Sequence, residues 1–480
     1  MHIIFQFIML NRKTKIIATI GPASSSPVRL KEMIMAGMNV ARINMSHYSD
    51  SNEVEKVVNL IRWSSKKYGK TISILFDICG PKIRIKSTIP KGKILIKKNK
   101  EYSLGVGKVN IPINNKIDFS YVKKDQIIKI DDGKIEFSII SKRYKHSIQV
   151  KALNEGVIYA SKGINFPNIK LNIPSLNSKD ISDINLGCNL KVDWFAHSFV
   201  RTDQDYDSFA KIISSNLEDI PVIAKIETPQ AIKNIDKLID IYDGILIARG
   251  DLGVELPIEQ LPILQKMIIK KCNKRGKPVI TATQMLDSMV SSPSPTRAEV
   301  ADVAGAVYDG ADAVMLSAET AVGSYPVDSI KTMSSIAENV EEEISRSSGF
   351  QINEPKFKKT NVLTSICHAA YNIALDINIP VIAVMTESGS TAKMVSNFRA
   401  DANIVAICPY EKIANQLNIF WGVNTLILNQ MDNVDDMVLG CQKLLKDKKM
   451  IKKKQKFVFI AGVPVGVPGS TNLLKVHEVE

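Results

Sequence analysis

The chain has 480 residues, 45% of them hydrophobic, and a formal net charge of +14. This length exceeds one ordinary hydrophobic core and predicts two to four domains, while no apolar stretch reaches the roughly 20 residues that a membrane span needs. The six cysteines are scattered without a C-x-x-C pair, which argues against a disulfide framework or a zinc site and favours a reducing, cytoplasmic location.

Eight short apolar runs are spread along the chain, and each ends on a charged or hydroxyl-bearing residue. The runs are Lys15–Ile20, Val40–Asn44, Ile72–Asp77, Trp194–Phe199, Val222–Glu227, Gly244–Asp251, Val279–Thr283 and Ala313–Glu319. A continuous apolar run of this length is typical of a strand covered on both faces. Most runs precede a helical pattern, such as Ala231–Leu238 or Ile258–Arg275. Eight strand–helix units predict a closed (β/α)₈ TIM barrel, built from residues 11–84 and 173–345.

Residues 85–172 have a different pattern, with short β-type runs in place of long helical ones. The runs are Lys93–Ile96, Ile127–Ile130, Ile135–Ile140 and Ser147–Val150. Turn signals such as Asp131-Asp132-Gly133 separate them. We predict a small β-barrel inserted into the third β/α connection, where two chain crossings would let it act as a hinged lid.

A second α/β pattern follows a polar stretch at 347–359. Leu363–Leu375 reads as a helix and Val381–Thr386 as a strand, so residues 360–480 are predicted to form a separate open-sheet domain. The loop Thr386–Thr391 opens a predicted helix, where hydroxyls and N–H groups can cradle an anion. The alternative is a plain helix-capping turn.

The ends of two neighbouring predicted strands bring together one lysine and two carboxylates. Lys225 and Glu227 point the same way because side chains alternate along a strand, and Asp251 ends the next run. Two carboxylates suit Mg²⁺, which leaves coordination positions for substrate oxygens. Lys225 can neutralise charge on a transferring group, and Gly250 lets a ligand approach backbone N–H groups. The alternative is a Lys–Glu ion pair at the barrel rim.

Other predicted strands also end on polar side chains. Thr283, Ser317 and Glu319 end the last two strands, where hydroxyls can orient a substrate or pass a proton, although Ser317 could equally cap the next helix. Arg42 belongs to the second strand and can bind a phosphate through two N–H groups. Three further oxygen-bearing residues could hold a monovalent cation: Asn44, Ser46 and Asp77.

These motifs, in this order, resemble the pyruvate kinase family over essentially the whole chain. The matching stretches are Thr14–Ser24, Ala41–His47, Asp77–Arg84, Ser198–Arg201, Ile223–Glu227, Ala248–Glu255, Thr281–Met289 and Pro295–Pro326. The resemblance implies a mobile inserted lid, a C-terminal regulatory domain and a homotetramer. It also implies the last step of glycolysis, in which phosphoenolpyruvate and ADP give pyruvate and ATP.

The resemblance implies a role for each matched residue. Lys225 is similar to the lysine that stabilises the transferring phosphoryl group and the enolate, and Glu227 and Asp251 to the ligands of Mg²⁺, for which Mn²⁺ can substitute. The matched substrate-binding residues are Arg42, Lys225, Gly250, Asp251 and Thr283. The matched nucleotide-binding residues are Asn44, Met45, Ser46, His47, Arg84 and Lys162. The matched K⁺ ligands are Asn44, Ser46, Asp77 and the carbonyl of Ile78.

Two further assignments follow from the resemblance. Thr283, acting through water toward Ser317 and Glu319, is our candidate donor of the proton that converts enolate to pyruvate. The matched loop for a sugar-phosphate effector comprises Thr386, Ser388, Gly389, Ser390 and Thr391. To catalyse phosphoryl transfer, a protein mainly has to position the reactants and place positive charge around the moving group.

Lys82 departs from the pattern of many family members, which have glutamate there. In the family, glutamate goes with a need for K⁺ and lysine with independence of it. A fixed ammonium can replace the charge of a mobile cation, so the sequence predicts little need for K⁺.

Two other classes of function fit part of the pattern. A Mg²⁺-dependent lyase or aldolase could use Lys225, Glu227 and Asp251, but it would need no nucleotide site. The positive charge could indicate nucleic-acid binding, but the lysines are spread along the whole chain. We therefore expect no nucleic-acid or membrane partner.

Overall fold

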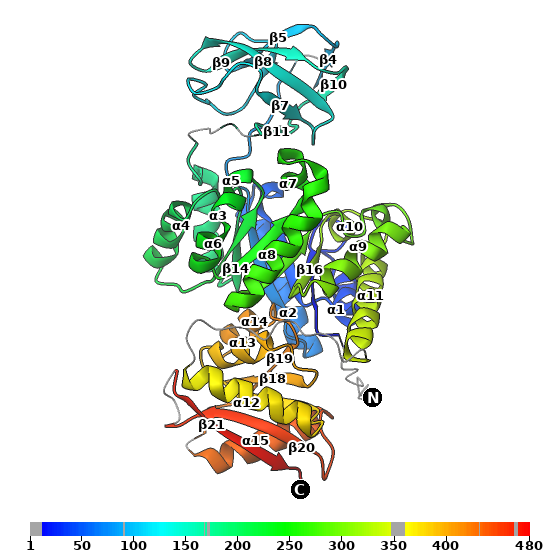
Figure 1. The fold of residues 1–480 in the computed structure, drawn as a ribbon, viewed down its shortest axis with the longest axis vertical. Helices are drawn as coiled ribbons and strands as arrows, with labels where there is room; N and C mark the ends of the chain where they lie inside the picture. Colours follow the sequence, from blue (N-terminus) through cyan, green and yellow to red (C-terminus); the bar gives the residue numbers. More distant parts are fainter. Residues whose placement is uncertain are drawn as a thin grey trace.

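The computed structural model describes residues 12–89, 92–167, 169, 173–346, 361–431, 433–464 and 469–480. Three bodies follow one another along the long axis, with a β module above the barrel and an α/β domain below it (Figure 1). The predicted linker at 347–359 and the predicted boundary residues 11, 172 and 360 lie outside the described residues. No helix in the described part of the chain is long and apolar enough to cross a membrane.

The predicted barrel is confirmed. Its parallel strands close in the order β1-β16-β15-β14-β13-β12-β3-β2. Their bounds are β1 Lys15–Thr19, β2 Val40–Asn44, β3 Ser73–Ile78, β12 Trp194–His197, β13 Val222–Ile226, β14 Gly244–Ala248, β15 Val279–Ala282 and β16 Ala313–Leu316. Nearly every strand residue is buried, which explains the continuous apolar runs.

Helices surround the barrel between its strands. They are α1 Pro27–Ala36, α2 Ser51–Tyr68, α3 Ser178–Asn189, α4 Gln204–Ser215, α5 Pro229–Lys233, α6 Ile235–Ile241, α7 Arg249–Glu255, α8 Leu261–Arg275, α9 Arg297–Tyr308, α10 Ala318–Ala321 and α11 Pro326–Arg346. The single helix predicted at Ala231–Leu238 is wrong. Two helices, α5 and α6, meet at Asn234, whose side-chain amide donates to the carbonyls of Arg201 and Gln230.

The inserted segment is all-β, as predicted, and its described strands pair into one sheet of six strands and one of two. They are β4 Lys93–Ile96, β5 Glu101–Gly105, β6 Ile111–Pro112, β7 Ile127–Ile130, β8 Ile135–Tyr144, β9 Ser147–Ala152, β10 Gly156–Tyr159 and β11 Ile164–Asn165. The module has its own hydrophobic core. Its two chain crossings meet where Arg84 pairs with Gly163.

The C-terminal α/β domain has a five-stranded sheet in the order β19-β18-β17-β20-β21, with β21 antiparallel. Its strands are β17 Val381–Met385, β18 Asn403–Cys408, β19 Val423–Ile427, β20 Lys456–Gly462 and β21 Thr471–Glu478. Its helices are α12 Val362–Asp376, α13 Ser390–Asn397, α14 Glu411–Leu417 and α15 Val434–Asp447. The domain packs against the amino ends of the barrel strands, where Lys15 Nζ donates to the Val423 carbonyl at 2.6 Å. The carboxyl ends therefore face the β module (Figure 1).

Candidate active site at the barrel mouth

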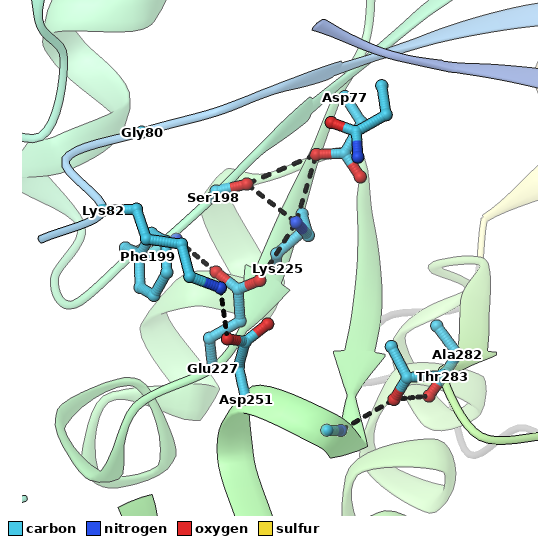
Figure 2. A network of polar contacts seen from close by, with 12 residues as sticks. Asp77, Gly80, Lys82, Ser198, Phe199, Lys225, Glu227, Asp251, Ala282 and Thr283 are labelled. Atoms are coloured by element: carbon cyan, nitrogen blue, oxygen red, sulfur yellow. Dashed lines mark hydrogen bonds and ion pairs between the residues drawn. The ribbon is translucent and has the colours of Figure 1, made fainter. Parts of the chain in front are cut away.

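Lys225, near the end of β13, lies at the centre of a polar network at the barrel mouth (Figure 2). Its ammonium lies 3.1 Å from Asp77 Oδ1, 2.8 Å from Ser198 Oγ and 3.0 Å from Glu227 Oε1. An ammonium has three N–H groups, so these acceptors use all of them. These residues lie on, or directly after, three adjacent strands, β3, β12 and β13, which explains how positions far apart in the chain converge.

Asp77 joins this network to Arg42. The Arg42 guanidinium lies 2.7 Å from Asp77 Oδ2 and donates to Thr19 Oγ1 at 2.8 Å. Lys225 and Arg42 lower the pKa of the Asp77 carboxyl, although burial opposes this shift. Arg42 is only 8% exposed, so its charge is held within the mouth by a buried anion.

The electrostatics keep Lys225 charged. Burial acts to lower the pKa of Lys225, but Asp77 and Glu227 raise it above its ordinary value. Burial raises the pKa of Glu227, and Asp251 adds to this rise, whereas Lys225 opposes it. Glu227 therefore lies close enough to Asp251 to be affected by its charge, and Figure 2 shows the two side chains next to one another.

Glu227 and Asp251 form the carboxylate pair that the sequence predicted, with one correction. β14 ends at Ala248, so Asp251 lies in the first turn of α7 and not at a strand end. Glu227 is 1% exposed, and its Oε2 accepts the Phe199 N–H at 2.6 Å. Asp251 Oδ1 lies 3.0 Å from Lys82 Nζ.

The donor set at this pair fits Mg²⁺. Among the described residues, no cluster of three or more His, Cys, Asp or Glu side chains could hold a metal ion. Mg²⁺ commonly takes one or two carboxylates and completes its shell with water and substrate oxygens, as Glu227 and Asp251 would allow. Lys225 forms an ion pair with Glu227, and Lys82 forms one with Asp251.

Thr283 follows β15 and has φ of +70°, an uncommon conformation for a β-branched residue. Its Oγ1 accepts the Gly250 N–H at 2.7 Å and donates to the Ala282 carbonyl at 2.6 Å (Figure 2). The Gly250 N–H, which the sequence left open for a ligand, therefore has a partner within the protein. Strain of this kind costs about 1–3 kcal/mol and concentrates at functional sites.

The two remaining candidates for proton transfer lie beyond β16. Glu319 is buried and accepts the N–H groups of Leu286 at 3.2 Å and Ser317 at 2.7 Å. Burial raises the pKa of Glu319 despite these hydrogen bonds. Ser317 occupies the N-cap of α10 without a side-chain capping bond, so the capping alternative does not describe it.

The residues expected to bind the nucleotide lie in two separate parts of the structure. Asn44 ends β2, and Met45, Ser46 and His47 form the short 3₁₀ helix that follows. Arg84 and Lys162 lie on the two crossings to the β module: Arg84 Nη1 donates to the Ser161 carbonyl at 3.1 Å, and the Lys162 ammonium lies 2.8 Å from Asp131 Oδ1.

Two of the expected K⁺ ligands, Asn44 and Asp77, have partners within the protein. Asn44 Oδ1 accepts the Ser46 N–H at 3.2 Å, and both oxygens of Asp77 bind cationic side chains. Lys82, expected to replace the K⁺ charge, extends to Asp251 and not to Asp77.

A cavity of about 350 Å³ lies between the β module and the barrel rim, beside this network. Lys82 and Phe199 line it from the barrel, and Asn165 and Phe166 from the module. Asn165 Nδ2 donates to Glu255 Oε1 at 2.8 Å, which links the module to α7.

Comparisons with known proteins match the whole arrangement. Residues 11–330 match the family model "Pyruvate kinase, barrel domain", and residues 364–477 match "Pyruvate kinase, alpha/beta domain". Pyruvate kinase of Staphylococcus epidermidis is 39% identical over 98% of this chain and 80% of its own length. That of Clostridium acetobutylicum is 38% identical over 98% and 100%.

The chain belongs to the pyruvate kinase family. A crystal structure of a pyruvate kinase from Cryptosporidium parvum has a TM-score of 0.91 and 33% identity, covering 98% of this chain and 97% of the other. Membership makes the protein a glycolytic kinase that moves the phosphoryl group of phosphoenolpyruvate and yields pyruvate.

The loop that the sequence predicted to bind an effector lies at the start of α13. Thr386 Oγ1 accepts the Gly389 N–H at 2.9 Å, Ser388 Oγ donates to Ser390 Oγ at 3.2 Å, and Thr391 contacts Thr471 Oγ1 at 2.7 Å. A cavity of about 60 Å³ adjoins the loop, and Glu387 is the one charged residue among those that line it in the described chain.

Two residues that contact this network had no role in the sequence analysis. Ser198 and Phe199 follow β12 and contact Lys225 and Glu227 directly. The available signal was their place at the end of a buried strand, within the matched stretch Ser198–Arg201.

Proposed function

We propose that this enzyme transfers the phosphoryl group of phosphoenolpyruvate to ADP, with Mg²⁺ and little need for K⁺. The observation that carries the proposal is the convergence of Lys225, Glu227 and Asp251 at one mouth, with Lys225 and Glu227 3.0 Å apart. Their charges match those that phosphoryl transfer requires.

The protein groups would act by position and charge. Arg42, oriented by Asp77 and Thr19, would bind the substrate phosphate. Lys225 would contact the moving phosphoryl group and then the enolate. Glu227 and Asp251 would hold Mg²⁺, which supplies positive charge to the phosphoryl and carboxylate oxygens when bound.

The remaining substrate contacts come from three elements. Gly250 and Asp251 in α7 and Thr283 after β15 would hold the carboxylate of phosphoenolpyruvate. The nucleotide would bind between the η1 residues Met45–His47 and the crossings that carry Arg84 and Lys162. Lys162 is paired with Asp131 and has a raised pKa, first through that hydrogen bond, so it would reach ADP as a cation.

For the proton that completes pyruvate, we propose a water held by Thr283, with Ser317 and Glu319 behind it. The hydrogen bonds of Glu319 fix its carboxylate beside β16. Burial raises the pKa of Glu319, which favours the protonated form of its carboxyl group over the charged form.

Weak K⁺ dependence is supported by the fixed cations of the mouth. Asp77, which would be a K⁺ ligand with Asn44, Ser46 and Ile78, has Arg42 and Lys225 as partners. Lys82 adds a third cationic side chain, which pairs with Asp251. Together these side chains supply positive charge without a mobile ion.

We further propose a homotetramer regulated by a sugar monophosphate at Thr386–Thr391. Among the described residues, hydroxyls line the cavity beside this loop, Glu387 is the one charged side chain, and no lysine or arginine is present, which favours a monophosphate over a more highly charged anion. Adding ribose 5-phosphate should shift the phosphoenolpyruvate saturation curve; an unchanged curve would count against this effector.

A coupled assay of pyruvate formation, with and without ADP, tests the main proposal. We expect ADP-dependent turnover, since a lyase or aldolase would not need ADP. Lys225→Met should lose nearly all activity while retaining the fold, which circular dichroism can check. Lys211→Met, at an exposed lysine on α4, is the matched control and should retain activity. Turnover without ADP, or an active Lys225→Met enzyme, would contradict the proposal.

A further inference from the structure

Ser198 is the neutral partner of the Lys225 ammonium. It accepts a hydrogen bond from Lys225 Nζ at 2.8 Å, whereas the other two partners of this ammonium are carboxylates. The Ser198 hydroxyl also donates to Asp77 Oδ1 at 3.3 Å. Lys225, Asp77 and Ser198 thus form a closed triangle of contacts (Figure 2).

The barrel topology determines this placement. β12 lies between β3 and β13, and His197 pairs with Ile78 on one side and Ala224 on the other. Ser198, the first residue beyond β12, therefore lies between Asp77 and Lys225. It is 2% exposed, so its hydroxyl has little access to water as an alternative partner.

The three partners of Lys225 differ in how easily they can be exchanged. To bind a phosphoryl oxygen, the ammonium must release one N–H from a present acceptor. Separating it from a buried carboxylate leaves two poorly compensated charges, whereas releasing a hydroxyl leaves a neutral group. The Ser198 hydroxyl also keeps Asp77 as an acceptor after that release.

We propose that Ser198 is a positioning residue for Lys225, holding one N–H of its ammonium in place until the substrate phosphoryl oxygen takes it. Without Ser198, Asp77 and Glu227 would still hold the charge of Lys225, but its third N–H would have no fixed direction. The inference rests on the proposed role of Lys225 and adds to it a residue that acts through Lys225.

Kinetics of Ser198→Ala test this proposal. We expect kcat to fall about tenfold, the value of one hydrogen bond to a charged group, with little change in KM for phosphoenolpyruvate. Ser198→Cys, which fills the space with a weaker acceptor, should resemble Ser198→Ala. Ser198→Thr keeps the hydroxyl and should recover part of kcat. The control is Ser329→Ala, which removes a buried hydroxyl in α11 that bonds the Tyr325 carbonyl.

The outcomes separate this inference from the proposed function. Wild-type kcat in folded Ser198→Ala or Ser198→Cys would overturn it, as would a folded Ser198→Thr enzyme no faster than Ser198→Ala. An equal fall of kcat in Ser329→Ala would assign the effect to lost stability and also overturn it. Lys225→Met is assayed beside them, because an active Lys225→Met enzyme would refute the role of Lys225 itself.

Discussion

At the scale of single residues, positive and negative side chains alternate in the network at the barrel mouth. Arg42, Asp77, Lys225 and Glu227 contact one another in that order, and Lys82 pairs with Asp251 beside them. Burying charges is tolerable here because each has an opposite partner. Replacing one member leaves its neighbour unpaired, so charge-removing variants should affect both activity and local structure.

Lys82 allows a residue-scale prediction about K⁺. Turnover of the wild-type enzyme should change little when KCl replaces tetramethylammonium chloride at constant ionic strength, because fixed ammonium groups already supply the charge. Lys82→Glu should raise the K⁺ dependence several-fold. The exposed Lys86 offers the control Lys86→Glu, which should leave K⁺ dependence unchanged. Strong K⁺ activation of the wild type would refute the prediction.

The carboxylate pair of Glu227 and Asp251 supports a second prediction at the scale of single residues. Asp251→Asn keeps the shape of the side chain but removes one of two carboxylate charges, so Mn²⁺ affinity should fall at least tenfold. Free Mn²⁺ measured by electron paramagnetic resonance reports this without any turnover. Asp302→Asn, which alters the partner of Arg249 outside the pair, is the control. Equal Mn²⁺ affinity of Asp251→Asn and wild type would place the ion elsewhere.

At the scale of elements, the loop after β3 depends on Gly80. This residue has φ of +70°, and a Cβ there would lie 3.0 Å from the Ser198 carbonyl oxygen and 3.2 Å from the Phe199 ring. Gly107, in the β module, has φ of +104° with nothing within 4 Å of such a Cβ. A Cβ would therefore meet backbone strain at either position, but only at Gly80 would it also be crowded by neighbouring atoms.

This difference predicts unequal effects of adding a methyl group. Gly107→Ala should cost about 1 kcal/mol of stability, from backbone strain alone, and leave kcat unchanged. Gly80→Ala should cost more and lower kcat, because the loop or Ser198 must move. Thermal unfolding and steady-state kinetics of both variants check this. Similar effects at both sites would show that the approach to Ser198 is unimportant.

At the scale of the whole molecule, Lys15 links the barrel to the C-terminal domain. Its ammonium is buried at the amino end of β1 and donates to the Val423 carbonyl in β19. Burial and the nearby Arg12 lower the pKa of Lys15 to about 7, against 10.5 in the unfolded chain, with Glu341 opposing.

The direction of this shift predicts a pH dependence of stability. Between pH 7 and 10.5 the unfolded state holds more protons at Lys15 than the folded state, so stability should rise with pH across this window. Below pH 7 both states are protonated and the slope should vanish. Lys15→Met removes the contribution, so wild type should gain stability relative to this variant as pH rises. Parallel urea midpoints at pH 7, 8 and 9 would contradict the prediction.

Much of the fold could be predicted because its signals are local. The apolar runs located the barrel strands, and Lys93–Ile96 and Ile127–Ile130 matched β4 and β7 as predicted. Short or partly exposed strands were not predicted: β11 is two residues long, and β21 is half-buried or exposed at every position after Thr471. Their conformation depends on pairing with distant strands more than on their own pattern.

The amino-acid sequence by itself determined the barrel, the inserted β module, the C-terminal domain and the set of charged residues at the strand ends. Only the tertiary structure decided which of these charges pair, namely Lys82 with Asp251 and Arg42 with Asp77. It also decided that the neutral Ser198 hydroxyl lies between Asp77 and Lys225. The physical reason is that hydrophobic periodicity acts within one segment, whereas a hydrogen bond depends on the closure and register of strands far apart in the chain.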